Sequence, residues 1–365
     1  MSITKLGFVG LGLIGGSIAK TAKRIHPDLK IIALSGHQST IDAAFQEGLI
    51  ENQKNASIED FSDCDYIFLC TPVQQNQGYL KQLKEIINPD CIITDVGSVK
   101  GDIHREILAM GMEHCFIGGH PMTGSEKTGL KNATAYLLEN AYYIITPTPS
   151  VSRERIEEFS QFVSSLGAIP LVLDYNLHDK ATAAISHLPH VIAYALVNLV
   201  KDSDSRDEVM KRIAAGGFKD ITRIASSSPV MWEEICISNK EMLLSMIDTF
   251  GQYLSDIRQK IADCDAKSIR GFFQDAKDYR DSLAVSPKNT VQTVFELYCD
   301  LIDEAGGIAT ISTILATHNL SIKNIGIIHN REFEDGVLKI EMYDQPSYIN
   351  AIELLRNYQY TVYER

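Results

Sequence analysis

A short glycine-rich segment constrains the fold of this chain more than any other feature. Residues 10–15 read GLGLIG; they follow an apolar run at Lys5–Val9 and precede a helical pattern. This strand–turn–helix context is what the dinucleotide motif G-x-G-x-x-G requires. Gly10 permits the tight turn, Gly12 lets the backbone approach a pyrophosphate, and Gly15 lets the helix pack against the strand. Free N–H groups and the helix dipole then bind the phosphates, although a plain glycine-rich turn is the alternative. The candidate cofactor contacts are Gly10, Leu11, Gly12, Leu13, Ile14 and Gly15.

Residues 1–173 alternate between short apolar runs and amphipathic segments, which is typical of an α/β fold. Near-continuous apolar strands indicate burial on both faces of a parallel sheet. We therefore predict a Rossmann-type, doubly wound domain here. The expected strands are Lys5–Val9, Ile31–Leu34, Tyr66–Cys70, Cys91–Asp95, Phe116–Gly118, Tyr142–Thr146 and Ile169–Leu173.

Residues 174–285 lack strand-like runs, and an apolar stripe at helical spacing extends from Met242 to Ile261. We predict an all-helical domain that dimerises, because so few residues leave apolar faces uncovered. After a linker near Pro287, residues 293–365 follow a β-α-β-β-α-β order. That order predicts a ferredoxin-like α+β domain.

Composition excludes several classes of protein. A formal net charge of −13 argues against a nucleic-acid partner. The seven cysteines are scattered without C-x-x-C, which favours reduced thiols in the cytoplasm over disulfides or a zinc ribbon. The start of the chain lacks the pattern of a signal peptide. We expect no membrane span, since the most apolar helix candidate, Val191–Val200, is shorter than the roughly 20 residues a bilayer requires.

The choice of dinucleotide depends on the end of the second predicted strand. A carboxylate roughly 20 residues after the glycine motif would bind the ribose 2′-hydroxyl of NAD, and an arginine would bind the 2′-phosphate of NADP. Ser35 occupies that place and is followed by Gly36 and His37. A serine donates to either group, so NAD is favoured only weakly and NADP stays open.

Three further segments carry unusual polar density. The first two, at residues 95–100 and 118–129, follow predicted strands, where ligands bind in open α/β sheets. The third comes from the helical region and comprises residues 187–190 and 216–223. Together these segments predict a substrate site between the sheet and the helices.

These segments resemble the prephenate and arogenate dehydrogenases of tyrosine biosynthesis over roughly residues 5–280. The most specific stretches are GLGLIGGS at 10–17, TDVGSVKG at 94–101, GGHPMTGSEKTG at 118–129, HLPH at 187–190 and GGFKDITRIA at 216–225. The C-terminal region resembles an ACT domain, an amino-acid-sensing module found in some family members. The resemblance implies an NAD(P)-dependent dehydrogenase that converts prephenate into 4-hydroxyphenylpyruvate and CO2.

The resemblance also assigns roles to residues of the sheet domain. His120 matches the family histidine that accepts the hydroxyl proton as hydride leaves, and a pKa near 6.5 suits that role. The alternative is a turn histidine before Pro121. Ser98 matches a serine that hydrogen-bonds this centre, and the alternative is a helix N-cap. Glu126 resembles a gating or orienting residue, and the alternative is a solvated loop charge.

The remaining site residues belong to the helical region. Arg223 matches an arginine that binds a substrate carboxylate, which a guanidinium can do bidentately; the alternative is a surface pair with Asp220. His190 matches a histidine near the substrate side chain. His187 beside it either binds substrate or packs a helix kinked at Pro189. Gly217 completes the candidate substrate contacts.

Other functions remain open at this point. A β-hydroxyacid dehydrogenase of similar architecture would place a catalytic lysine in a G-x-x-x-K helix, a spacing that Lys180 lacks. A metal enzyme using three histidines lacks a completing ligand, so no metal is expected. A non-catalytic sensor conflicts with the intact glycine motif. The ACT-like module is expected to bind L-tyrosine at Asp303, Gly306 and Gly307, or else only to mediate oligomerisation.

Overall fold

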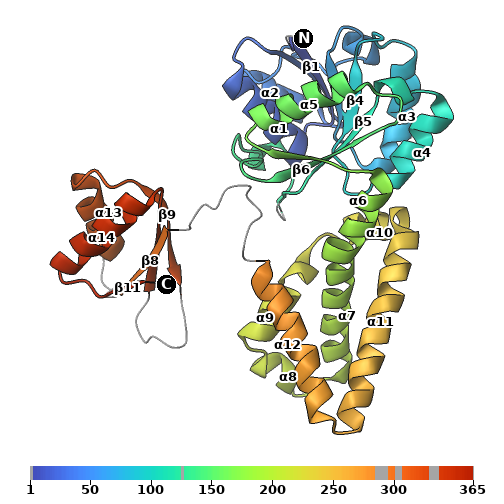
Figure 1. Ribbon diagram of the computed structural model, residues 1–365. Coiled ribbons are helices and arrows are strands. Elements are labelled where there is room, and N and C mark those ends of the chain that lie inside the picture. The colour runs from blue at the N-terminus through green and yellow to red at the C-terminus, as the bar shows by residue number, and fades with distance from the viewer. Residues whose placement is uncertain (1–2, 125–126, 284–294, 301–305, 329–336, 365) are drawn as a thin grey trace. The chain divides into compact units, whose positions relative to one another are not determined.

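The computed structural model describes residues 3–124, 127–283, 295–300, 306–328 and 337–364 (Figure 1). The chain divides into two compact units, Met1–Cys264 and Asp265–Arg365. The first holds the predicted dinucleotide motif and the predicted catalytic residues, and the second holds the predicted effector loop. Each is described by itself.

The first unit begins with a parallel four-stranded sheet in the order β2-β1-β3-β4. This order and the crossover helices confirm the Rossmann-type prediction. An isolated parallel bridge between Ile93 and Phe116 then links β4 to a second sheet, ordered β5-β6-β7. The strands are β1 (Lys5–Val9), β2 (Lys30–Leu34), β3 (Tyr66–Leu69), β4 (Ile92–Asp95), β5 (Ile117–Pro121), β6 (Tyr142–Pro147) and β7 (Ile169–Val172).

The last two strands correct the expectation of a wholly parallel sheet. β6 pairs antiparallel with β5, and β7 pairs parallel with β6. A parallel neighbour needs a crossover connection, usually a helix. Between β5 and β6 the described chain forms only the short 3-10 helix η3 (Leu130–Asn132), so the strand returns in the opposite direction.

Apolar cores on both faces explain why the strands read as continuous apolar runs. On β3, Tyr66 and Phe68 face one core, and Ile67 and Leu69 face the other. Phe68 stacks on Phe8 of β1 with ring centroids 5.0 Å apart. The helices of this region are α1 (Leu13–Ile25), α2 (Gln38–Gln46), α3 (Val73–Lys84), α4 (Gly101–Met110) and α5 (Arg153–Ser165), with short 3-10 helices η1 (Ile58–Phe61) and η2 (Glu113–Cys115).

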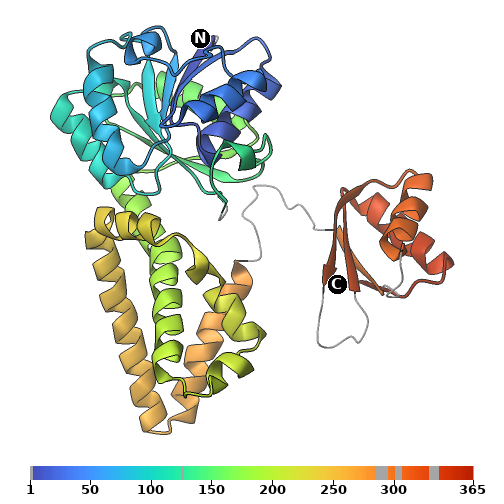
Figure 2. The ribbon, with the colours of Figure 1, turned by 180° about the vertical axis from the view of Figure 1, so that it is seen from behind.

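The rest of the first unit is helical, as predicted. α7 and α11 are its two long helices and lie side by side (Figure 2). The elements are α6 (Tyr175–Thr182), the π-helical turn η4 (Ala183–His187), α7 (Leu188–Ser203), α8 (Val209–Ile213), α9 (Gly216–Thr222), the 3-10 turn η5 (Arg223–Ser226), α10 (Pro229–Ser238) and α11 (Lys240–Ala262). Proline at the second position of α7 disrupts the usual ladder, and the π turn directly before it accommodates the change.

The helical run that includes α6, η4 and α7 corrects our argument about membrane spans. Tyr175–Ser203 forms 29 helical residues and contains an 18-residue window with a mean hydropathy of 1.5, so it is long and apolar enough to cross a bilayer. The expectation that the most apolar helix is too short to span a bilayer is therefore wrong. This run also carries buried His178, Asp179 and His187, which make hydrogen bonds inside the protein.

The second unit contains α12 (Ala266–Ser282) and an antiparallel sheet ordered β11-β8-β10-β9. Sheet order and element order confirm the ferredoxin-like prediction. Its core includes Leu297, Ile311, Leu338 and Leu355. The remaining elements are β8 (Phe295–Asp300), α13 (Gly307–Thr317), β9 (Ile322–Ile328), β10 (Val337–Met342), α14 (Gln345–Asn357) and β11 (Val362–Glu364).

All seven cysteines carry free thiols, as predicted, and burial raises the pKa of Cys64, Cys70, Cys91, Cys115 and Cys299. The predicted boundaries at 173 and 285 stay predictions. The contact pattern groups α12 with the C-terminal unit, whereas we assigned it to the helical domain.

Candidate active site

The glycine turn lies where a dinucleotide would bind. Gly10 adopts φ +96°, and a Cβ there would lie 2.8 Å from the backbone of Cys70 at the end of β3. A Cβ on Gly15 would lie 2.6 Å from the carbonyl oxygen of Gly10. A Cβ on Gly12, in contrast, would meet nothing within 4 Å. Two glycines are therefore needed for packing, and the middle one borders open space.

The amino end of α1 fits a diphosphate. Its N-cap, Gly12, provides no side-chain hydrogen bond, and the first turn contains no acidic residue. The first N–H groups of the helix thus remain available to an anion. Leu11 is buried beneath the turn, whereas Leu13 and Ile14 are half-buried. The residues present fit the cofactor that the sequence predicts.

The second strand ends as expected at Ser35. Asn55 fixes this residue through its side chain, which accepts from the Ser35 N–H at 2.8 Å and donates to the Ser35 carbonyl at 2.5 Å. The carboxylate that usually binds a ribose is absent from this position.

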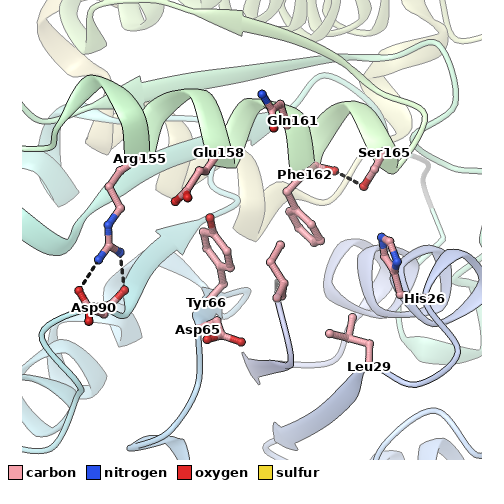
Figure 3. Close-up of a pocket in the computed structure, with 11 residues that line it drawn as sticks. His26, Leu29, Asp65, Tyr66, Asp90, Arg155, Glu158, Gln161, Phe162 and Ser165 are labelled. Carbon is pink, nitrogen blue, oxygen red and sulfur yellow. Dashed lines mark hydrogen bonds and ion pairs between the residues drawn. The ribbon is translucent and has the colours of Figure 1, made fainter. Parts of the chain in front are cut away.

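A cavity of about 370 Å³ lies at the opposite edge of the sheet (Figure 3). Tyr66 and Phe162 stack in its wall, and Arg155 forms an ion pair with Asp90 at 2.7 Å. Five of the lining residues lie on α5, and the others lie in the segments before β1, β2, β3 and β4 or begin a strand, so they mark the amino edge. Ligands of open α/β sheets bind at the carboxyl edge, so this cavity is not the cofactor site.

His120 lies half-buried near the end of β5, a strand that continues the carboxyl edge of the parallel sheet. Burial lowers the pKa of His120 well below its usual 6.5, and the neighbouring His178, Lys100 and His187 lower it further. The imidazole is therefore neutral near pH 7. That is the form that accepts a proton.

His178 of α6 forms a hydrogen bond with His120, and the neighbouring Asp179 forms one with His178. His120 Nδ1 lies 2.8 Å from His178 Nε2, and His178 Nδ1 lies 2.7 Å from Asp179 Oδ1. Asp179 also accepts the backbone N–H groups of Lys100 at 2.8 Å and Gly101 at 2.7 Å. Burial alone would raise the pKa of Asp179, but the hydrogen bonds from His178 and this backbone outweigh it, so the pKa is lowered.

A buried ion pair supports the same edge of the sheet. Lys100 and Asp95 are at most 1% exposed, and the Lys100 ammonium donates to Asp95 Oδ2. The ammonium also donates to the Gly119 carbonyl at 2.8 Å, next to His120. Burial lowers the pKa of Lys100, and Asp95 opposes that shift. The pair joins the end of β4 to β5.

Ser98 lies half-buried in the loop between Asp95 and Lys100. Its hydroxyl makes no hydrogen bond within the part of the chain that the structure describes. The N-cap of α4 is Lys100, so the helix-cap alternative for Ser98 is wrong. Asp179 instead accepts the first N–H groups of α4 from another helix.

His187 and His190 have different surroundings. His187 is 1% exposed, lies 3.1 Å from the Asn239 side chain, and burial lowers its pKa to about 4. These contacts favour the packing alternative over substrate contact. His190 is half-buried, stacks on Trp232 at 3.7 Å between centroids, and lies 2.9 Å from the Ser186 carbonyl. Burial also lowers the pKa of His190.

The other substrate candidates are not joined to His120 by any contact among the described residues. Arg223 begins η5 and is exposed, and it interacts with another part of the protein. η5 packs on α7, where Tyr194 donates to the Ser227 carbonyl at 2.7 Å. Gly217 is exposed in α9, and Glu126 lies outside the described residues.

The predicted effector turn is only partly described. Gly306 adopts φ +99° and caps α13, which begins at Gly307, so a glycine is suited to this position. Asp303 lies outside the described residues. Within the described part of the chain, no group of three His, Cys, Asp or Glu side chains could hold a metal ion.

Sequence reasoning missed His178 and Asp179. They lie 58 and 59 positions after His120, and sequence separation gave no indication of contact. One available signal was Asp179 near the start of the most apolar helical run of the chain, because an aspartate is rarely buried without a partner.

Comparisons with known proteins identify the family to which the chain is similar. The family description "Prephenate dehydrogenase, nucleotide-binding domain" matches residues 18–171, and "Prephenate dehydrogenase, dimerization domain" matches residues 174–275. The prephenate dehydrogenase of Bacillus subtilis is 38% identical over 335 residues, covering 91% of this chain and 90% of that protein.

Two solved structures extend the likeness to three dimensions. Prephenate dehydrogenase from A. aeolicus, in complex with hydroxyphenyl propionate and NAD+, has a TM-score of 0.73 and 31% identity, covering 78% of this chain and 99% of that one. Synechocystis arogenate dehydrogenase has a TM-score of 0.70 and 30% identity, covering 77% and 100%. With two domains matched and a relative of this identity aligned over most of its length, the chain belongs to the prephenate dehydrogenase family.

Proposed function

We propose that this chain is an NAD-dependent prephenate dehydrogenase of tyrosine biosynthesis. The reaction converts prephenate and NAD+ into 4-hydroxyphenylpyruvate, CO2 and NADH. One observation carries the proposal: a neutral imidazole, His120, lies near the end of β5, which continues the carboxyl edge of the parallel sheet that presents the glycine turn. NAD, when bound there, supplies the hydride acceptor.

His120 accepts the proton of the ring hydroxyl as the same carbon gives up its hydride. Loss of CO2 from the ring carboxylate then makes the ring aromatic, and the proton returns to the phenolic oxygen. Ser98 is assigned to hydrogen-bond the reacting oxygen, and its hydroxyl, which has no partner among the described residues, supports this assignment. A neutral base of this kind contributes typically 10²–10⁴-fold to the rate.

The substrate carries two carboxylates, which need cationic or N–H partners. Arg223 is assigned to one of them because a guanidinium binds a carboxylate bidentately. His190 is assigned to the side chain, beside Trp232, whose buried indole N–H has no hydrogen-bond partner among the described residues. Glu126 and Gly217 stay assigned to substrate by sequence resemblance alone.

A steady-state assay of prephenate and arogenate with NAD and NADP tests the activity. We expect the highest kcat/KM with prephenate and NAD. A preference for arogenate favours the second candidate function, which the likeness to the Synechocystis enzyme supports. Turnover of neither substrate would overturn the proposal.

Replacing His120 with Asn tests the proposed base. We expect kcat to fall by roughly 10²–10⁴ while NADH binding persists, because the amide cannot accept the proton at neutral pH. Near-normal turnover of His120→Asn would contradict this role. Arg223→Ala with an unchanged KM for prephenate would contradict the assignment of Arg223.

The protein is proposed to act as a cytoplasmic homodimer. The helical region exposes many large apolar side chains, among them Ile185, Leu199, Ile213 and Ile237 at 62% or more. Sedimentation at micromolar concentration checks this.

The C-terminal unit is proposed to bind L-tyrosine near Gly306 and Gly307 and to restrain activity by linkage between sites. Unchanged activity and thermal stability with tyrosine would exclude it.

A further inference from the structure

We propose that His178 and Asp179 are positioning residues that fix the catalytic tautomer of His120. This inference rests on the proposed role of His120 as the base. The two residues lie on α6, the first helix after the sheet, and they reach His120 through hydrogen bonds of 2.8 and 2.7 Å. Neither residue is assigned a contact with the substrate.

The direction of the hydrogen bonds follows from their end point. The ionised Asp179 carboxylate can only accept, so the Nδ1 of His178 must carry a proton. In the arrangement we infer, the Nε2 of His178 carries no proton and accepts from the Nδ1–H of His120. A neutral His120 with its proton on Nδ1 leaves Nε2 as the free acceptor. The series therefore selects the tautomer that can take the substrate's proton.

Burial of His178 and Asp179 strengthens the preference for this tautomer of His120. His178 is 1% exposed and Asp179 is 5% exposed, so water cannot replace either partner at low cost. Asn239, itself 3% exposed, donates to the Asp179 carbonyl at 2.9 Å and holds α6 from the side of α11. A histidine held by a buried carboxylate is the arrangement that orients the base in serine proteases, where losing the correct tautomer lowers kcat about 10⁴-fold.

Asp179 also joins the base to the loop that carries Ser98. Its two oxygens accept the backbone N–H groups of Lys100 and Gly101, at the start of α4. One carboxylate thus fixes both the ring of His120, through His178, and the loop between β4 and α4. A purely structural role for this cap is the competing explanation, and the experiment must separate the two.

The charged and titratable groups around His120 set the expected pH dependence. His178 faces it from α6, Lys100 from the start of α4, and His187 from the π turn. Asp179 supplies the negative charge beyond His178, and Asp95 pairs with Lys100. Removing the charge of Asp179 leaves the cation of Lys100 in place. Protonated His120 is then less favourable, and the acid limb of the kcat profile moves to lower pH.

The test uses the full-length enzyme with prephenate and NAD. His178→Leu removes both hydrogen bonds, whereas His178→Gln retains an amide oxygen that can accept from His120. We expect kcat to fall on the order of 10²–10⁴-fold in His178→Leu and by less in His178→Gln, with little change in KM for NAD. Asp179→Asn should lower kcat and shift the acid limb to lower pH.

His104→Gln is the matched control. His104 is also a buried histidine, 1% exposed, but it bonds Thr146 at 3.0 Å and belongs to no step of the proposed reaction. Its loss should lower the thermal midpoint and leave the acid limb unchanged. NADH titration and circular dichroism confirm that each variant is folded, and His178→Gln serves if His178→Leu does not fold.

Several outcomes would overturn the inference. One is a kcat of His178→Leu within threefold of wild type, and another is His178→Gln no more active than His178→Leu with the acid limb unmoved in Asp179→Asn. These outcomes leave the proposed function intact if His120→Asn is inactive. If His120→Asn keeps its turnover, the role of the base itself fails, so the two failures are distinguishable.

Discussion

Both edges of the parallel sheet carry charged residues, but those at the carboxyl edge are buried and those at the amino edge are partly exposed. At the carboxyl edge Lys100, Asp95 and Asp179 are nearly inaccessible to water, and each hydrogen-bonds several partners. At the amino edge Arg155 and Asp90 line the cavity of Figure 3, with side chains 25% and 66% exposed. The difference separates charges fixed in place for chemistry from charges that water can screen.

The physical reason lies in the cost of burial. A buried ion pair is weak support for stability as a whole, yet removing one partner leaves an uncompensated charge at a cost of about 3–5 kcal/mol. A surface pair contributes about 0–1 kcal/mol. The carboxyl edge therefore tolerates little change, and the amino edge tolerates much. Three predictions test this contrast, beginning with the largest effect.

Lys100→Met should show the largest effect. It removes the cation from Asp95 and leaves that carboxylate buried, with the Gly97 and Gly119 N–H groups as its remaining donors among the described residues. We expect a loss of about 3–5 kcal/mol in the free energy of unfolding, measured by urea denaturation at pH 7. Asp95→Asn added to Lys100→Met should recover part of it, because no unpaired charge then remains. A loss below 1 kcal/mol would remove the contrast between the edges.

The second-largest expected effect is a loss of folding stability in acid, caused by protonation of the buried His104. Burial lowers the pKa of His104 to about 4, so the folded protein keeps this imidazole neutral where the unfolded chain already binds a proton. Stability from His104 is therefore present above pH 6.5 and is lost as the pH falls towards 4. At pH 5 the loss is about 2 kcal/mol.

Urea denaturation of wild type and His104→Gln at pH 7 and pH 5 measures this contribution. The variant should lose less stability between the two pH values, because it has one fewer histidine to protonate. His187, whose pKa is also lowered to about 4 by burial, remains in both proteins and adds its own loss. Equal losses in the two proteins would mean that His104 does not stay neutral in the folded state.

The features that the sequence could predict are those that depend on local patterns of residues. The glycine motif, the seven strands and the C-terminal β-α-β-β-α-β order were predictable because each depends on local periodicity and turn chemistry. His120 and Ser98 were singled out because they lie at or just after strand ends and match residues of the family that the sequence resembles. Local patterns of this kind repeat over a few residues, so a single sequence contains them in full.

The direction of β6 and the partners of His120 could not be predicted in the same way. Strand direction depended on the missing crossover between β5 and β6, and the sequence between them gave no clear helical pattern to test. The contact between His120 and His178 depended on how α6 packs against the sheet, and the Asp95–Lys100 pair on both side chains being buried together. These are tertiary facts, which periodicity does not report.

The amino edge should show the smallest effect. Arg155→Ala removes the ion pair with Asp90, which joins α5 to the segment before β4. Because these side chains are partly solvated, we expect a loss below about 1 kcal/mol in urea denaturation, and less in 1 M NaCl, where charges are screened. Arg153→Ala on the same helix is the matched control, since Arg153 is 92% exposed and pairs with Glu157. If Arg155→Ala instead lost 2 kcal/mol or more beyond this control, the guanidinium would be as firmly fixed as Lys100, and the cavity beside it would have to be treated as a built site.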